Sequence, residues 1–187
     1  MKVICISNSK GGVGKTTTAV HLADSLAKDG RTLLIDIDVQ ANASSIFMEG
    51  EVPAELTVYG ALREKRPMGQ LIHGTRNPGL DIVPATIQLA ELESLLSGAL
   101  DGFFRLSESL RMQDLPYEFV IIDCPPNLGM VTVNAFVAAT HVLVPLQTAK
   151  FSLDGLAALT STIKTVQSRF NQGLKILGGV LTMYNPR

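Results

Sequence analysis

The sequence predicts a single α/β domain, built as a three-layer, doubly wound and mostly parallel sheet with helices on both faces. Short apolar runs rich in β-branched residues alternate with longer stretches of helical period, the pattern of parallel strands joined by crossover helices. The apolar runs carry almost no charge, which indicates strands buried on both faces. A length of 187 residues suits one domain with its own core.

Six strands are expected along the chain. The first follows Lys2 directly, and five of the runs are nearly continuous in apolar side chains. The sixth contains a glycine pair, which weakens a strand interior. The expected strands are Val3–Ser7, Thr32–Ile37, Leu80–Val83, Phe119–Ile122, Val142–Leu146 and Ile176–Leu181.

Helices are expected between these strands. The clearest spans Thr16–Lys28, where Val20, Ala23 and Ala27 share one face and Gly30 follows as a C-terminal cap. The other stretches of helical period are Val58–Glu64, Leu89–Leu96, Phe103–Met112, Val131–Ala139 and Leu153–Arg169.

The composition excludes several classes of protein. Hydrophobic residues make up 46% and charged residues 18%, which excludes a disordered chain. The net charge of -1 provides no overall basic field, so binding to DNA or lipid would need a local patch. Cys5 and Cys124 lie in no metal-binding or disulfide pattern, and a cytoplasmic location is expected.

A phosphate-binding loop is expected between the first strand and the first helix. Glycines at 11, 12 and 14 let consecutive backbone N–H groups turn inward around an anion, at the start of a helix. Lys15 would supply a charge for the β- and γ-phosphates, and the Thr16 hydroxyl would ligate Mg²⁺. The alternative is a glycine-rich turn with two solvated lysines.

Three carboxylates follow apolar strands. Asp36 and Asp38 end the second strand, and Asp123 ends the run Phe119–Ile122. Ligands of doubly wound folds bind at the carboxyl ends of strands, where these acids should lie. Asp123 has the Walker B arrangement, in which the carboxylate holds Mg²⁺, often through water. The alternative for Asp36 and Asp38 is a pair of solvated acids.

The pattern K-G-G-x-G-K-[ST] at residues 10–16 resembles the deviant Walker A motif of the ParA/MinD family of P-loop ATPases. The stretch 36–42 is similar to the family's D-x-D-P-Q-x-N, with Val39 in place of proline and Ala41 where glycine is common. Asp-x-Pro-Pro at 123–126 resembles the family's second switch. The similarity covers nearly the whole chain and favours the ParA branch over MinD.

The resemblance implies a weak, partner-stimulated ATPase that uses ATP and Mg²⁺. An ATP-bound homodimer would bind DNA non-specifically, and a ParB-like protein would stimulate hydrolysis. The cycle would position plasmid, chromosome or protein cargo at the nucleoid, with no membrane partner. The implied catalytic residues are Lys10, which would reach the partner's nucleotide, Lys15 and Asp38, which would orient water. The implied ATP-binding residues are Lys10, Gly11, Gly12, Val13, Gly14, Lys15, Thr16 and Thr17, and the implied metal residues are Thr16, Asp36 and Asp123.

The chain also departs from the family pattern. It ends at Arg187, directly after a strand, whereas family members continue through further helices and another strand, so residues 1–187 are expected to be a single ATPase domain without that continuation. Two alternatives are open: the sequence is a fragment, or it is a shortened member of the family with weaker contacts to DNA. Ala149–Lys150 replaces an acidic and aromatic pair near the dimer face.

Two alternative functions stay open. One is a MinD-like membrane-associated positioning ATPase, which needs a basic amphipathic C-terminal helix. The other is a P-loop kinase or synthetase that acts on a small molecule, against which Lys10 argues.

Overall fold

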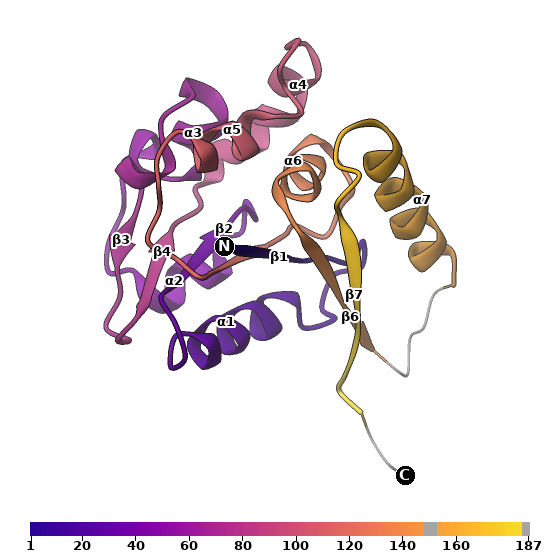
Figure 1. The fold of residues 1–187 in the computed structure, drawn as a ribbon, viewed down its shortest axis with the longest axis horizontal. Coiled ribbons are helices and arrows are strands. Elements are labelled where there is room, and N and C mark those ends of the chain that lie inside the picture. Colours follow the sequence, from indigo (N-terminus) through magenta and orange to yellow (C-terminus); the bar gives the residue numbers. More distant parts are fainter. Residues whose placement is uncertain (148–152, 185–187) are drawn as a thin grey trace.

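A seven-stranded sheet runs through the middle of the protein, in a computed structural model that describes residues 1–147 and 153–184 (Figure 1). The strand order is β3-β4-β2-β5-β1-β6-β7, and every pairing is parallel except the antiparallel β3–β4 pair at one edge. The mostly parallel sheet predicted from the sequence is therefore confirmed. The strands are β1 (Lys2–Ile6), β2 (Thr32–Asp36), β3 (His73–Gly74), β4 (Leu80–Val83), β5 (Phe119–Asp123), β6 (His141–Gln147) and β7 (Lys175–Thr182).

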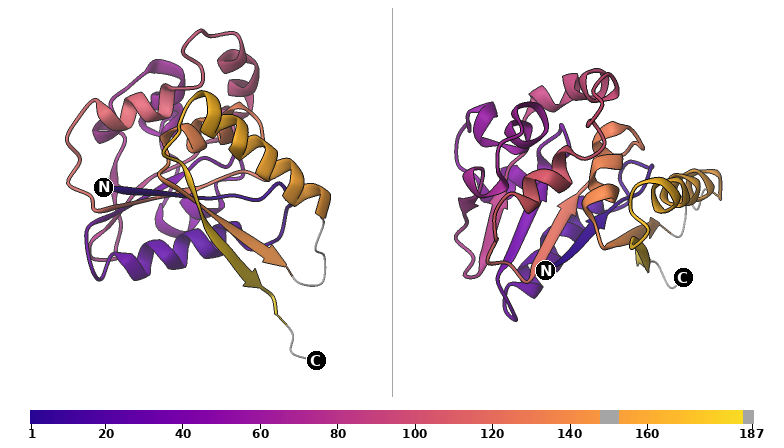
Figure 2. Two further views of the ribbon diagram at one scale, coloured as in Figure 1. Left: turned by 45° about the vertical axis from the view of Figure 1, so that its right-hand side comes forward. Right: turned by 45° about the horizontal axis from the view of Figure 1, so that its top comes forward.

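Helices cover both faces of this sheet, as Figures 1 and 2 show. Helices α1 and α2 lie on one face, and α3 to α7 lie on the other. Short 3₁₀ turns at Ala54–Leu56, Met68–Gln70 and Ile87–Glu91 connect some of these elements. The α-helices are α1 (Lys15–Leu26), α2 (Asn42–Phe47), α3 (Val58–Glu64), α4 (Leu92–Ser97), α5 (Arg105–Arg111), α6 (Met130–Ala138) and α7 (Leu153–Arg169).

Each face of the sheet has its own apolar core. On the smaller side, Ala19 and Ala23 of α1 are fully buried against sheet residues such as Ile6 and Leu34. Their small side chains let α1 pack close to the strands. This packing sets the position of the α1 N-terminus relative to the carboxyl ends of the strands. On the other side, buried residues of α3 to α7 pack on Cys5, Ile35 and neighbouring strand residues.

The register of the three central strands brings their carboxyl ends together. Asp123 of β5 is paired with Asp36 of β2 on one side and with Ile6 of β1 on the other. Strand β1 leads directly into the glycine-rich segment before α1. The predicted phosphate loop and two of the predicted acids therefore meet at one edge of the sheet.

Element boundaries follow the sequence expectations closely. Val58–Glu64, Leu80–Val83 and Leu153–Arg169 begin and end at the predicted residues. The sequence reading missed α2 and β3, which are six and two residues long and too short to show a periodic pattern. It also took residues 89–91 as α-helix, whereas they belong to a 3₁₀ turn.

The glycine pair in β7 has a structural cause. The pairing of β6 with β7 skips Leu177, because Val142 pairs with Ile176 while Leu143 pairs with Gly178. This is a β-bulge, and Gly178 adopts φ +150°, a conformation that L side chains rarely adopt. The bulge lets β7 continue beside β6 as far as Thr182.

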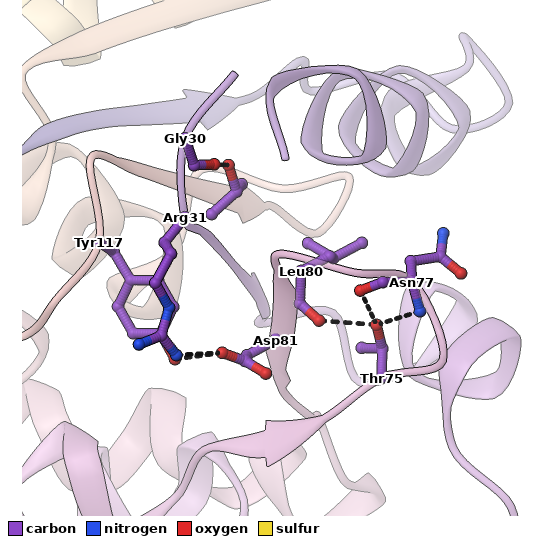
Figure 3. Close-up of polar contacts among 8 residues, drawn as sticks. Gly30, Arg31, Thr75, Asn77, Leu80, Asp81 and Tyr117 are labelled. Atoms are coloured by element: carbon purple, nitrogen blue, oxygen red, sulfur yellow. Dashed lines mark hydrogen bonds and ion pairs between the residues drawn. The ribbon is translucent and has the colours of Figure 1, made fainter. Parts of the chain in front are cut away.

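A polar network ties the strands together at the opposite edge of the sheet (Figure 3). The Tyr117 hydroxyl donates to Asp81 Oδ2 at 2.7 Å, and Arg31 Nη2 forms an ion pair with the same oxygen at 3.2 Å. The Arg31 guanidinium also lies 5.2 Å from the centre of the Tyr117 ring. These contacts join the segments before β2 and β5 to β4, away from the predicted site.

No helix within residues 1–147 and 153–184 combines the length and the hydropathy needed to cross a membrane. The Ala149–Lys150 pair, where the sequence departs from the family pattern, lies outside the described residues.

Candidate nucleotide-binding site

The glycine-rich segment forms an open depression at the carboxyl edge of the sheet. The depression has a volume of about 330 Å³, and larger ones flank α2. It is lined by backbone and side chains from four parts of the chain, which the fold brings together. The lining residues are Gly11, Gly12, Gly14, Lys15, Thr16, Thr17, Asp38, Gln40, Asn42, Pro126 and Met183.

The backbone conformation of the loop beside this depression depends on glycine. Gly12 and Gly14 adopt φ +70° and +84°, which turn successive peptide units in a way that only glycine adopts without strain. Helix α1 begins at Lys15 with no side-chain cap and no acidic residue in its first turn. Its first N–H groups and the positive end of its dipole would thus favour an anion bound in the depression.

Lys15 points back along the loop. Its side chain is buried, and Nζ donates to the carbonyl oxygen of Lys10 at 3.0 Å. Burial lowers the pKa of Lys15, while the nearby Asp123 and Asp38 carboxylates act in the opposite direction. An ammonium in this position faces the place where phosphate oxygens would lie above the loop.

Two residues that sequence reasoning missed fix the shape of the loop. The buried Asn8 accepts from the backbone N–H of Lys10 at 3.0 Å and donates to the Pro145 carbonyl at 2.8 Å. The Thr182 hydroxyl, at the end of β7, donates to the Val13 carbonyl at 2.8 Å. The Asn8–Pro145 and Thr182–Val13 bonds each join residues more than 130 positions apart, so no local sequence pattern signals them.

The predicted loop residues differ in their position. Val13 is buried behind the loop, Thr17 is exposed on the first turn of α1, and Lys10 is half-buried at the start of the loop. Neither Lys10 nor Val13 lines the depression, whereas the other predicted loop residues do.

Asp36 anchors the loop that follows β2. It is fully buried, and its Oδ1 accepts from the backbone N–H of Asp38 at 3.0 Å. Its Oδ2 accepts from both the backbone N–H and the hydroxyl of Ser44, each at 2.8 Å. Burial raises the pKa of Asp36 to about 6, against the effect of these hydrogen bonds. Since both oxygens are engaged, its role as a metal residue stays a prediction.

Ser44 was also missed by the sequence reading, and it joins two loops. Its hydroxyl donates to Asp36 and accepts from the backbone N–H of Ala85, just after β4, at 2.8 Å. Ala41, where glycine is common in the resembling family, adopts φ +50°. For an alanine, the left-handed backbone conformation costs about 1 kcal/mol relative to the right-handed one. The Asp36–Ser44 hydrogen bonds therefore stabilise a loop conformation that Ala41 by itself does not favour.

Asp38 lies at the mouth of this loop. Its side chain is mostly buried and lines the depression, and its Oδ1 accepts from the backbone N–H of Gln40 at 3.0 Å. Oδ1 is thereby fixed in an Asx-type turn. The carboxylate faces the same space as Lys15 and Thr16.

The Asp123 carboxylate is buried with little to stabilise its charge. It is fully buried, and neither of its oxygens has a hydrogen bond of acceptable geometry among the described residues. Burial and the neighbouring Asp36 raise the pKa of Asp123 to about 7, and the Thr16 hydroxyl and Lys15 act in the opposite direction. An uncompensated buried carboxylate is costly unless a cation or proton offsets it.

The residues present fit Mg²⁺. The Asp123 oxygens and the Thr16 hydroxyl are oxygen ligands, which Mg²⁺ prefers. No group of three acidic, histidine or cysteine side chains in the described part of the chain could hold a metal. A site of this kind suits an ion that takes its remaining ligands from phosphate and water.

The loop that follows Asp123 is fixed at its far end by Glu93 of α4. Glu93 Oε2 accepts from the backbone N–H of Met130 at 2.6 Å, which caps the N-terminus of α6. A Cβ at Gly129 would lie 2.4 Å from Glu93 Oε1, so a larger residue there would require the Glu93 carboxylate to move.

The two cysteines lie beside this site but are buried. Cys5 and Cys124 are fully buried free thiols, and burial together with the adjacent Cys5 thiol raises the pKa of Cys124. The sequence reading expected no partner for Cys124, and the structure places Cys5 against it. A raised thiol pKa disfavours the reactive thiolate.

Replacing Ser44 by alanine is expected to lower the free energy of unfolding by about 1–3 kcal/mol, because the buried Asp36 oxygen and Ala85 N–H each lose a partner. Ser45→Ala is the matched control, since Ser45 is exposed and donates only to Asn42 within its own helix; its loss should stay below about 0.5 kcal/mol. Urea unfolding of the three proteins measures both values, and equal losses would contradict the bridging role.

Comparison with known proteins adds to this geometry. A family model described as an AAA domain matches residues 1–176. The chromosome partitioning protein ParA of Myxococcus xanthus is 46% identical over 187 residues, which are all of this chain and 66% of the relative. The sporulation initiation inhibitor protein Soj of Bacillus subtilis is 42% identical over all of this chain and 74% of the relative.

The fold matches a solved structure that contains a nucleotide. The crystal structure of cobyrinic acid a,c-diamide synthase from Mycobacterium smegmatis, with bound ADP and magnesium, superposes with a TM-score of 0.92 at 34% identity. The match covers all of this chain and 76% of that chain. The chain thus spans about two thirds to three quarters of the length of the proteins it matches.

Proposed function

Because the chain belongs to the ParA/MinD family of P-loop ATPases, we propose that it binds ATP with Mg²⁺, dimerises on ATP and hydrolyses it slowly. The observation that carries this proposal is the pairing of a glycine loop at a helix N-terminus with a buried Asp123 carboxylate beside it that lacks hydrogen-bond partners in the described part of the chain. A loop that binds anions could by itself bind any phosphate compound. Because a carboxylate that favours a cation lies beside it, the loop is better matched to a nucleotide that carries Mg²⁺.

Residues of the loop bind the triphosphate. The backbone N–H groups of Gly11 to Thr17 surround the phosphates, and Lys15 contacts the β- and γ-phosphates. Lys15 exchanges its bond with the Lys10 carbonyl for phosphate oxygens when the nucleotide enters. Thr16 and Asp123 hold Mg²⁺, which offsets charge on the β- and γ-phosphates.

Asp38 orients the attacking water. Its Oδ1 is fixed by the Gln40 N–H, so its other carboxylate oxygen is available at the edge of the depression. A carboxylate there accepts a hydrogen bond from water and turns an oxygen lone pair to the γ-phosphorus.

Lys10 acts across a twofold axis. Two subunits close face to face over two nucleotides, and Lys10 of each subunit offsets charge on the phosphoryl group bound by the other. Groups supplied in trans in this way contribute about 10³–10⁵ in rate, or roughly 4–7 kcal/mol. A monomer therefore hydrolyses ATP very slowly.

The output of this cycle is positioning of cargo. The ATP-bound dimer binds DNA without sequence preference at the nucleoid, in the cytoplasm, and a ParB-like protein stimulates hydrolysis. The partitioning relatives named above support this part of the proposal, since the site itself does not fix a cargo.

The two lysines are expected to have separable effects. Lys15→Ala should abolish ATP binding, whereas Lys10→Ala should retain binding and lose ATP-dependent dimerisation. The loop contacts of Lys10 described above use its backbone N–H and carbonyl, which alanine keeps. Titration calorimetry measures binding, and size-exclusion chromatography with light scattering measures mass with and without ATP.

Lys28→Ala is the matched control, because Lys28 is an exposed lysine that lies just after the C-terminal end of α1. It should bind ATP and dimerise as the wild type does. An ATP-dependent dimer of the Lys10→Ala variant would overturn the role in trans.

DNA binding is expected to require ATP and to fall steeply with salt. A non-specific complex forms mainly through phosphate contacts, so log K should decrease linearly with log salt. Fluorescence anisotropy with a random-sequence duplex, measured with ATP, with ADP and without nucleotide, tests this expectation. Equal binding of DNA in all three conditions would contradict the proposed dependence of DNA binding on ATP. If the protein bound no DNA at all, the proposed role in partition would be wrong.

Product analysis separates this function from that of a small-molecule enzyme. Hydrolysis predicts one free phosphate for each ADP formed, without an added acceptor. A requirement for a small-molecule acceptor would favour the synthetase chemistry named for the structural relative from Mycobacterium smegmatis.

A further inference from the structure

We propose that Thr182 is a positioning residue for the phosphate loop, acting on the peptide bond between Val13 and Gly14. This inference rests on the proposed function, because it assigns a role in nucleotide binding. It starts from a contact between the end of the last strand and a loop near the start of the chain. Neither the glycine-rich motif nor the acids at the sheet edge include Thr182.

The contact is a directed hydrogen bond. The Thr182 hydroxyl donates to the Val13 carbonyl at 2.8 Å, with a second, longer contact of 3.4 Å to the carbonyl of Leu146 on β6. Val13 is 1% exposed, so solvent has little access to replace the hydroxyl at that carbonyl. Thr182 is also paired with Gln147 of β6, so the strand ladder holds its backbone beside the loop.

The geometry of the Val13–Gly14 peptide unit links this hydrogen bond to nucleotide binding. In a trans peptide the C=O and the following N–H point in opposite directions. A carbonyl of Val13 held against β7 therefore directs the N–H of Gly14 away from β7, into the depression that Gly14 lines. Gly14 has φ +84° and no side chain, so without this bond the peptide unit could rotate at low cost.

Packing supports the same orientation. A Cβ added to Gly14 would lie 3.4 Å from Thr182 Cγ2, so the threonine methyl group occupies the space beside the glycine position. Thr182 thus lies against the loop at both residues of this peptide unit, with its hydroxyl on Val13 and its methyl group beside Gly14. The next residue, Met183, lines the depression itself.

Substitutions at Thr182 distinguish the effect of its hydroxyl on nucleotide binding from the effect of its methyl group. Thr182→Val keeps the shape and removes the donor, and is expected to weaken binding of Mg²⁺–ADP about 3- to 10-fold, the effect of one neutral hydrogen bond. Thr182→Ala should weaken it at least as much. Thr182→Ser keeps the donor and should bind within about 2-fold of the wild type. ADP is the probe because it contains the β-phosphate and is not hydrolysed.

Thr160→Val is the matched control. The Thr160 hydroxyl donates to the Leu156 carbonyl at 2.8 Å within α7, so its loss removes a similar bond away from the loop. It should leave ADP affinity unchanged. Melting temperatures without nucleotide accompany each titration, because a merely structural role of Thr182 would lower the melting temperature and leave affinity as it was.

The outcomes are distinct. Weaker binding by the valine and alanine variants, with rescue by serine, supports the inference. A folded Thr182→Val protein that binds ADP as tightly as the wild type overturns it, as does a serine variant that is weakened as much as valine. Failure of the wild type to bind Mg²⁺–ADP would instead overturn the proposed function itself.

Discussion

The parallel register of β2, β5 and β1 is the constraint on which the site depends. It aligns the ends of three buried strands, so that Asp36, Asp123 and the residue before the phosphate loop lie side by side. Two carboxylates in adjacent strand ends, both fully buried, are unfavourable by themselves. The charge of Asp36 is stabilised by hydrogen bonds from the Ser44 and Asp38 N–H groups. Asp123 has no such bonds among the described residues and only partial help from Lys15 and Thr16, so a bound cation would stabilise it further.

The two halves of the site are stabilised in different ways. The anion half is a loop of glycines, and hydrogen bonds between its backbone and the side chains of Asn8, Lys15 and Thr182 fix its shape. The acidic half is a buried cluster whose raised pKa values report the cost of charge. A magnesium nucleotide brings anionic phosphates to the first half and a cation to the second, and this complementarity favours it over free phosphate.

The chemistry-bearing residues were predictable where they lie in local patterns. Gly11 to Thr17 and Asp123 each follow an apolar strand, which places them at the sheet edge without knowledge of tertiary contacts. Asn8, Ser44, Glu93 and Thr182 were not predictable, since each makes a bond to a residue between 37 and 169 positions away, and such bonds exist only after folding. For the same reason, the sequence did not show that Asp36 has both oxygens occupied.

A crystal structure of the protein with ATP, or a non-hydrolysable analogue, and Mg²⁺ tests the central claim most directly. We expect two subunits related by a twofold axis, with Lys15 on the triphosphate of its own subunit and the Lys10 ammonium within contact distance of the triphosphate bound by its partner. A nucleotide-loaded structure in which the Lys10 ammonium points into solvent, away from any triphosphate, would contradict it.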